Sequence, residues 1–406
     1  MTTALAVVEF LYAPISSAAP LARPSCQGVD VAPGDDLQGL IDARPRRTTF
    51  CFAKGVYLLA GTIWTGEKFP TLDLRSGAVI DGQAGSFIGI SGGGAPGNQR
   101  GTIILGGVFQ HFGNADAPIW VSPIIVGRNW IIKGTEFREN YNAGLGVQGS
   151  NARVSRIHTH HNGRYGLTVT PACTGCSGPS GVIIQDSEIS FNNTRKLSTL
   201  ADAGGTKFGH SDGMIVRGNE VHDNYGSGLW WDGFNKNARV YDNVIYDNLN
   251  WGIFWELSYG GTEIHHNSLN RNGVGDGTAN WGANVQLLVS TSDGGVDGIK
   301  IYSNAIRGTA FPLGLLNHGS VNPGTKQVYV HHNHMTLLAS TTRVGAAVFE
   351  GSIELFSASA NNRFDRNTYR VLDRGASYWA WNGRTLTWSQ WRAAGHDVNG
   401  AVKLIH

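Results

Sequence analysis

The stretch GSGLWWDGFNKNARVYDNVIYDNLNWGIFWELSYGG, residues 226–261, contains one short pattern twice. The pentapeptide GLWWD at residues 228–232 returns as GIFWE at residues 252–256, an interval of 24 residues, and both copies end in a carboxylate. Self-similarity at a fixed interval of this length is typical of repeat proteins, in which each copy is one structural unit stacked on the next.

Asparagines mark the same interval around this stretch. The regularly spaced asparagines are Asn219, Asn243 and Asn267, and, five residues further on in each copy, Asn224, Asn248 and Asn272. Looser copies end at Asn162, Asn192, Asn304, Asn333 and Asn367, so that the repeats extend over about residues 125–370. Each unit holds short Val/Ile/Tyr/Trp-rich pieces broken by Asn, Asp and Gly, which indicates strands and tight turns. An asparagine at a fixed place can adopt the left-handed turn conformation and bond to its equivalent one coil away.

The motifs VRGNEVHDN, VYDNVIYDN and IHHNSLNRN, which follow one another at residues 216–224, 240–248 and 264–272, resemble those of the right-handed parallel β-helix proteins of the pectate-lyase-like superfamily. The resemblance covers about residues 30–370. It implies an all-β fold, a single-stranded right-handed parallel β-helix. Lyases, hydrolases, epimerases and phage tailspikes share this fold, so the motifs predict the architecture and not the chemistry.

Composition supports a turn-rich β protein and excludes some partners. The chain has 56 glycines and only 15% charged residues. Its formal net charge is +2, and it has no Lys/Arg block of the kind that follows a phosphate backbone, so nucleic acid is not expected as a partner. No segment reaches about 18 continuous apolar residues, and we therefore expect no membrane span.

The two ends of the chain differ from the repeats. Residues 1–25 have an apolar stretch and small residues, as a secretory signal does, but they lack a basic start and include Glu9, which is typical of a remnant or an imperfect signal. Residues 26–406 are expected to form one β-helix domain. The segment GDDLQGLIDARP predicts a short N-terminal capping helix, and the Trp-rich residues from about 376 to 406 predict a C-terminal cap.

The four cysteines form two candidate pairs, Cys26 with Cys51 and Cys173 with Cys176. The second pair has CxxC spacing, but no other CxxC completes a zinc site, so disulfides are favoured over metal or redox use. Disulfides and a signal-like start together predict a secreted, extracellular protein. We expect it to be a monomer or a small homo-oligomer.

Strand side chains alternate between the two faces, so Asp232 and Glu256 are expected to point outward and to lie beside each other in successive coils. Leading glycines extend this outward column to other coils. The column is expected to contain Gln148, Thr170, Asp232, Glu256, Gln286 and His318, and a parallel column two residues earlier to contain Lys207, Trp230, Phe254 and Asn284. Stacked aromatic rings with amide, acid and amine groups around them are typical of a polysaccharide groove. Substrate binding is therefore predicted for Trp230, Phe254, Gln148, Gln286, His318 and Asn284.

The paired carboxylates predict a glycoside hydrolase, because two close carboxyl groups separate in pKa and can serve as acid and as base or nucleophile. This reaction needs no cofactor. The non-catalytic alternative is that Asp232 and Glu256 bind a calcium ion or a water molecule.

Lys207 indicates a second hypothesis, a polysaccharide lyase that acts by β-elimination on a uronic-acid polymer. Lys207 or His210 would be its base, and calcium held by the two carboxylates would neutralise the acid group of the sugar. His210, in the segment KFGHSDGM, could equally belong to an ordinary turn. A third hypothesis, from another class, is a non-catalytic glycan-binding or adhesion solenoid.

Overall fold

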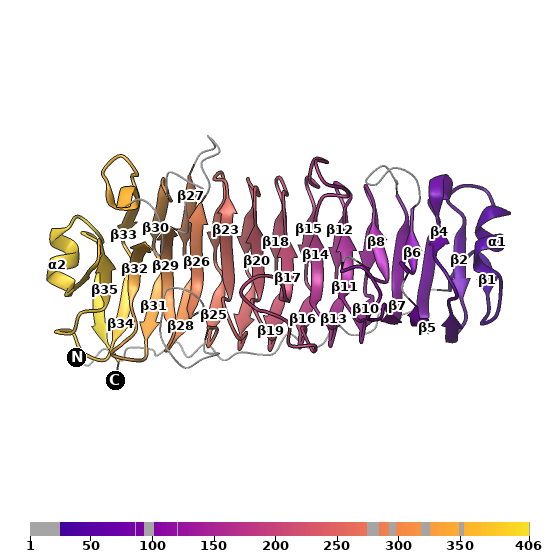
Figure 1. The fold of residues 1–406 in the computed structure, drawn as a ribbon, viewed down its shortest axis with the longest axis horizontal. Coiled ribbons are helices and arrows are strands. Elements are labelled where there is room, and N and C mark those ends of the chain that lie inside the picture. The colour runs from indigo at the N-terminus through magenta and orange to yellow at the C-terminus, as the bar shows by residue number, and fades with distance from the viewer. Residues whose placement is uncertain are drawn as a thin grey trace, which may run out of the picture.

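The computed structural model describes residues 25–85, 87–92, 101–119, 121–273, 284–291, 298–317, 325–348 and 353–405. These residues form a long solenoid of stacked coils, with the helix α1 (Leu37–Asp42) at one end and α2 (Trp388–Ala393) at the other (Figure 1). The predicted parallel β-helix is confirmed. Among the described strand pairs, all are parallel except the last hairpin, β35 with β36.

Each coil contributes one strand to each of three rows that run the length of the solenoid. One row is a 13-stranded sheet. Its strands are β4 (Ile63–Trp64), β6 (Ile90–Ser91), β8 (Ile124–Val126), β11 (Ala143–Val147), β14 (Tyr165–Val169), β17 (Gly204–Phe208), β20 (Leu229–Asp232), β23 (Ile253–Ser258), β26 (Val285–Thr291), β29 (Phe311–Asn317), β32 (Val344–Val348), β35 (Trp379–Trp381) and β36 (Arg384–Leu386).

The other two rows share strands β5 (Thr71–Gly85) and β7 (Ile103–Phe112) and together make a 24-stranded sheet. The first of them adds β1 (Val29–Val31), β2 (Thr49–Phe52), β9 (Ile131–Lys133), β12 (Arg153–Ser155), β15 (Ile183–Gln185), β18 (Ile215–Arg217), β21 (Arg239–Tyr241), β24 (Glu263–His265), β27 (Ile299–Tyr302), β30 (Val328–His331) and β33 (Arg363–Asp365). The second adds β3 (Gly55–Leu58), β10 (Glu136–Arg138), β13 (His158–His160), β16 (Glu188–Ser190), β19 (Glu220–His222), β22 (Val244–Tyr246), β25 (Ser268–Asn270), β28 (Ala305–Gly308), β31 (His334–Leu337), β34 (Thr368–Val371) and β37 (Ala401–Leu404).

Asparagine ladders hold the coils in register at two corners. Asn219 Nδ2 donates to Asn243 Oδ1 at 2.9 Å, and Asn243 Nδ2 donates to Asn267 Oδ1 at 2.9 Å. The parallel ladder runs through Asn140, Asn162, Asn192, Asn224, Asn248 and Asn272. These amides are buried, and each also donates to a backbone carbonyl, for example Asn243 to Val216 at 3.0 Å. The ladders therefore satisfy the backbone polar groups that the tight corners leave open.

The ends of the solenoid are covered as the sequence predicts. At the first coil, the side chain of Asp36 accepts a hydrogen bond from the Gly39 N–H and caps α1, whose Leu37 and Ile41 are buried. At the last coil, Trp379 and Trp391 are buried in the core, and Thr387 with Gln390 forms a capping box at the start of α2. The C-terminal tryptophans thus close the core.

The two predicted disulfides are present. Cys26 bonds to Cys51 and joins the first described residues to β2, and Cys173 bonds to Cys176 within the loop that follows β14. No helix in the described part of the chain is long and apolar enough to cross a membrane.

Candidate active site

Asp232 and Glu256 lie side by side on neighbouring strands. Strand β20 pairs with β23 in parallel, Leu229 with Ile253 and Asp232 with Glu256. Leu229, Trp231, Ile253 and Trp255 point into the core, as alternation predicts, so both carboxylates are on the outer face of the 13-stranded sheet. The expectation that residues 24 apart are stacked neighbours is confirmed here.

Lys207 reaches the pair from the preceding coil. Its Nζ lies 2.6 Å from Asp232 Oδ2 and 3.2 Å from the centroid of the Trp230 ring, and it donates to the Ala201 carbonyl at 3.2 Å. The Lys207 side chain is only 16% exposed. Burial lowers the pKa of Lys207, while the nearby charge of Asp232 opposes that change. The ion pair and the ring face hold the ammonium over one edge of the carboxylate pair.

Glu256 is the most perturbed carboxyl group of this cluster. Burial, and next the charge of Asp232, raise its pKa from 4.5 to about 7. Trp230 opposes this change, because its Nε1–H donates to Glu256 Oε2 at 2.8 Å, and Lys207 opposes it through its charge. A carboxyl group that titrates near neutral pH is suited to give and take protons there.

Three residues that the sequence reasoning missed lie next to this cluster. Arg164 forms an ion pair with Asp202, and the Tyr165 hydroxyl donates to Asp202 Oδ1 at 2.7 Å. Burial raises the pKa of the Tyr165 hydroxyl, and the charge of Asp232 adds to that effect. The repeat carries no signal for these residues, because Asp202 belongs to the loop of residues 193–203 that interrupts the period.

The prediction that the Trp230 and Phe254 rings form an open surface for sugar stacking is wrong. Trp230 and Phe254 do point outward from the sheet, and their rings stack with centroids 6.0 Å apart, but they are only 1% and 3% exposed. Both rings are buried in a second apolar cluster outside the main core. Its members are Trp230, Trp251, Phe254, Val285, Leu288, Phe311 and Leu316. Trp230 therefore acts on this site through its indole N–H and its ring face toward Lys207, not as an open platform.

The predicted places of Gln286 and Asn284 are also wrong. Strand β26 pairs with β23 so that Phe254 lies beside Leu288 and Trp255 beside Val289. Gln286 is therefore four residues before the position on β26 that would lie beside Glu256. Gln286 is fully buried, and its Nε2 donates to the Arg307 carbonyl at 2.7 Å. Asn284 is 2% exposed and lies before the strand begins. The insertion before β26 changes the distance from the leading glycine, so counting from Gly282 fails.

The remaining predicted residues have mixed positions. Gln148 follows β11, one residue after Val147, and is partly exposed in the same outward row as Asp232, because Val147 pairs with Val169, Val169 with Phe208 and Phe208 with Trp231. His210 is exposed in a left-handed turn, with its ring 4.9 Å from that of Phe234. No contact among the described residues joins the His210 side chain to Asp232 or Glu256, which agrees with an ordinary turn residue. His318 lies outside the described residues.

A metal-binding cluster is not evident in the residues that the structure describes: no group of three or more His, Cys, Asp or Glu side chains there could hold an ion.

Comparison with known proteins supports the fold. The family model described as "Right handed beta helix region" matches residues 124–292. No protein of curated function matches the chain in sequence. The class that the strand order and this match define is the right-handed parallel β-helix.

The solved structures to which the chain is similar are distant from it. The alginate lyase from Paenibacillus sp. str. FPU-7 is 12% identical, with a TM-score of 0.45, over 79% of this chain and 98% of that one. Pectate lyase Pel9A is 16% identical, with a TM-score of 0.42, over 80% of this chain and 78% of that one. The A-module of the mannuronan C-5 epimerase AlgE6 from Azotobacter vinelandii is 13% identical, with a TM-score of 0.41, over 88% and 90%.

Proposed function

We propose that this protein is a polysaccharide-cleaving enzyme whose proton-transferring residue is Glu256. The observation that carries the proposal is a carboxyl group with a pKa of about 7 on the outer face of a β-helix, beside Asp232 and within reach of the charge of Lys207. Perturbed titrating groups cluster at functional sites, since catalysis near neutral pH needs an acid or a base that changes protonation there. A solenoid face offers a long, open surface along which a polymer can lie.

We infer that β-elimination on a uronic-acid polymer fits this cluster better than hydrolysis. Hydrolysis needs two carboxyl groups that are both available to substrate or water. Here Asp232 is held by Lys207 at 2.6 Å, and Glu256 is the carboxyl group without an ion pair of its own among the described contacts. β-Elimination requires one base, which removes the C5 proton, and one cation, which stabilises the charge on the acid group of the sugar. This order of preference reverses the one that the sequence indicates.

In the proposed reaction, the Glu256 carboxylate takes the proton from C5 of the uronate. The electron pair of that C–H bond forms the C4–C5 double bond, and the bond from C4 to the glycosidic oxygen breaks. The proton held by Glu256 then passes to the leaving oxygen, so atoms and charge balance without another reactant. The Lys207 ammonium stabilises the negative charge that grows on the acid group of the sugar.

Hydrolysis is the second candidate, and the pairing of Asp232 with Glu256 favours it. Protonated Glu256 would protonate the glycosidic oxygen, and Asp232 would attack the sugar or activate water. A glycan-binding solenoid without activity is the third, and the apolar cluster around Trp230 gives it no support, because its rings are covered.

Products separate these reactions directly. A panel of uronic-acid and neutral polysaccharides is incubated with the wild-type protein and with Glu256→Gln. Elimination gives chain ends with the ultraviolet absorbance of an unsaturated uronate, and hydrolysis gives reducing ends without it. For either reaction, the wild type should cleave the polymer and Glu256→Gln should not. If the wild type cleaves no member of the panel, the binding module is favoured. We further propose that the protein acts outside the cell, in agreement with its two disulfides.

A further inference from the structure

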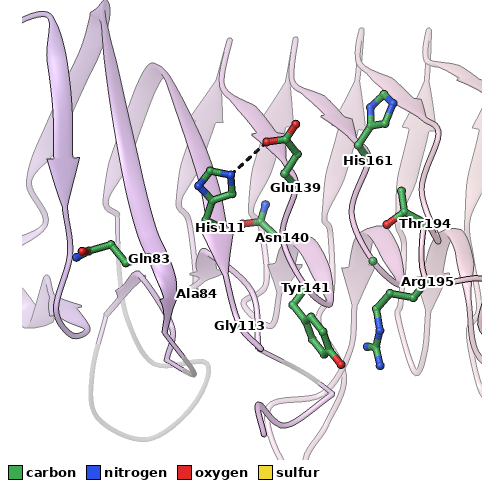
Figure 2. Close-up of a pocket in the computed structure, with 11 residues that line it drawn as sticks. Gln83, Ala84, His111, Gly113, Glu139, Asn140, Tyr141, His161, Thr194 and Arg195 are labelled. Atoms are coloured by element: carbon green, nitrogen blue, oxygen red, sulfur yellow. Dashed lines mark hydrogen bonds and ion pairs between the residues drawn. The ribbon is translucent and has the colours of Figure 1, made fainter. Parts of the chain in front are cut away.

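A hollow lies away from the carboxylate pair, at the corner where each coil enters the 13-stranded sheet. Its volume is about 550 Å³, and its lining includes His111, Glu139, Tyr141, His161 and Arg195 (Figure 2). Five consecutive coils contribute to it, the first through Gln83 and Ala84. None of these residues belongs to the site described above.

The corner presents side chains at intervals of one coil because of its backbone. His111, Glu139 and His161 have left-handed φ values of 58°, 53° and 54°. Each stands next to a position that the buried ladder fixes: Asn140 Oδ1 accepts from the Phe112 N–H at 3.0 Å, and Asn162 Oδ1 accepts from Asn140 Nδ2 at 2.9 Å. A left-handed residue other than glycine is strained, and the ladder hydrogen bonds offset that strain. The lining is therefore held rigidly.

Arg195 is an available cation at one end of this hollow. Its guanidinium carbon lies 3.9 Å from the centroid of the Tyr141 ring, and its Nη1 donates to Asn142 Oδ1 at 3.2 Å. No carboxylate pairs with Arg195 among the residues described. Figure 2 shows the Arg195 and Tyr141 side chains next to each other. Stacking and one hydrogen bond fix the plane of the guanidinium and leave other N–H groups for an anion.

Gly163 makes room for this arrangement. A Cβ at this position would lie 2.7 Å from Arg195 Cδ and 2.0 Å from the Tyr141 carbonyl oxygen. The backbone of the following loop is also fixed, because the Thr194 N–H donates to the Asn162 carbonyl at 3.2 Å and the Arg195 N–H to the Gly163 carbonyl at 3.3 Å. The position of Arg195 is thus built into the coil.

The opposite side of the hollow is polar and carries negative charge. His111 Nε2 lies 3.2 Å from Glu139 Oε2, and His111 Nδ1 lies 2.8 Å from Asp81 Oδ2. Carboxylate oxygens beside a pocket accept hydrogen bonds from hydroxyl groups and repel a dianion such as phosphate. A ligand with one negative charge and several hydroxyl groups fits both sides of the hollow.

We propose that this hollow is an accessory binding site for a uronate residue of an acidic saccharide. Arg195 binds its carboxylate, and Glu139 and His111 bind its hydroxyl groups. The site rests on the proposed function only for the choice of polymer. The loop of residues 193–203 connects the two sites, since it begins at the hollow and its Ala201 carbonyl accepts from Lys207 at 3.2 Å.

The test is a titration of the full chain with D-glucuronate and with D-glucose, in which NMR measures binding. We expect a millimolar Kd for glucuronate and binding of glucose at least tenfold weaker. Arg195→Gln is expected to weaken glucuronate binding at least tenfold, and Arg195→Lys, which keeps the charge and loses the planar stack, about threefold or more. Lys196→Gln, which removes the adjacent exposed cation, is the matched control and should bind normally.

Glu256→Gln keeps this hollow intact and should bind glucuronate as the wild type does, even if it cleaves nothing. Failure of the proposed function therefore leaves this result unchanged. The proposal is overturned if glucuronate does not bind, if Arg195→Gln binds it normally, or if glucose binds equally well.

Discussion

The Trp230 indole N–H donates a hydrogen bond of 2.8 Å to Glu256 on the next coil. The same ring carries the Lys207 ammonium 3.2 Å from its centroid, so one buried indole contacts both the cation and the carboxyl group of the site. The opposing effects of these neighbours on Glu256 can be measured one at a time.

Replacing Asp232 and replacing Lys207 should move the pKa of Glu256 in opposite directions. Asp232 raises this pKa and Lys207 lowers it, so Asp232→Asn should bring it below about 7 and Lys207→Met should raise it further. The measurement is a carbon-13 NMR titration of the Glu256 carboxyl group. Glu263→Gln, on another face of the coil, is the control and should leave the titration unchanged. Shifts of the same sign in the two variants would refute the electrostatic account.

Glu256 should also make stability depend on pH. Its folded-state pKa of about 7 is above the ordinary value of 4.5, so the unfolded chain releases this proton first as pH rises. Stability is therefore lost between about pH 4.5 and 7, by at most about 3.4 kcal/mol, and the loss is complete above that range. Glu256→Gln removes this cost and keeps an acceptor for Trp230. Its Tm should exceed that of the wild type near pH 8 and approach it near pH 4; an equal Tm difference at both pH values would contradict the assigned pKa.

The ladder amides should be worth several kcal/mol each. Asn243→Ala removes the acceptor of the Asn219 backbone N–H and Nδ2 and the side-chain donor to the Val216 carbonyl. Asn267 Oδ1 loses one of its two donors and keeps the backbone N–H of residue 243. We expect a loss of about 2–4 kcal/mol in the free energy of unfolding, measured by urea denaturation. Asn270→Ala, at a partly exposed outward position on β25, is the matched control and should change it by less than about 0.5 kcal/mol. A similar effect of both substitutions would show that the ladder contributes little.

The two disulfides should differ in what they contribute. Cys26–Cys51 closes a loop with a sequence separation of 25, whereas Cys173–Cys176 closes one of 3. Chain entropy predicts about 3.5 kcal/mol for the first and under about 2 kcal/mol for the second. Paired Cys→Ser variants, compared by thermal unfolding, test this order. A larger loss from the Cys173/Cys176 variant would mean that its loop does more than close a short ring.

The regular part of the fold could be predicted from the sequence because one coil repeats its spacing. The interval between Asp232 and Glu256 is the same as that between Asn219 and Asn243, and a parallel coil turns equal spacing into adjacency. The expectation failed at Gln286, where an insertion precedes the strand and the leading glycine no longer fixes the register.

Exposure could not be predicted from alternation. Alternation gives the face of the sheet, and Trp230 and Phe254 are on the outer face as expected, but Trp251 and Leu288 cover them in a second apolar cluster. Arg164 and Asp202 were missed for a related reason, since their contact joins a coil to an irregular loop. Arg195 likewise belongs to a loop, so only the fold brings it to Tyr141.

The central claim is that Glu256 transfers the proton in cleavage of a polysaccharide on this face of the solenoid. The most direct measurement is the formation of unsaturated chain ends from a uronic-acid polymer by the wild type and by Glu256→Gln. Circular dichroism verifies that both proteins are folded. We expect unsaturated products from the wild type and a rate at least 100-fold lower from Glu256→Gln. Equal rates from the two proteins would contradict it.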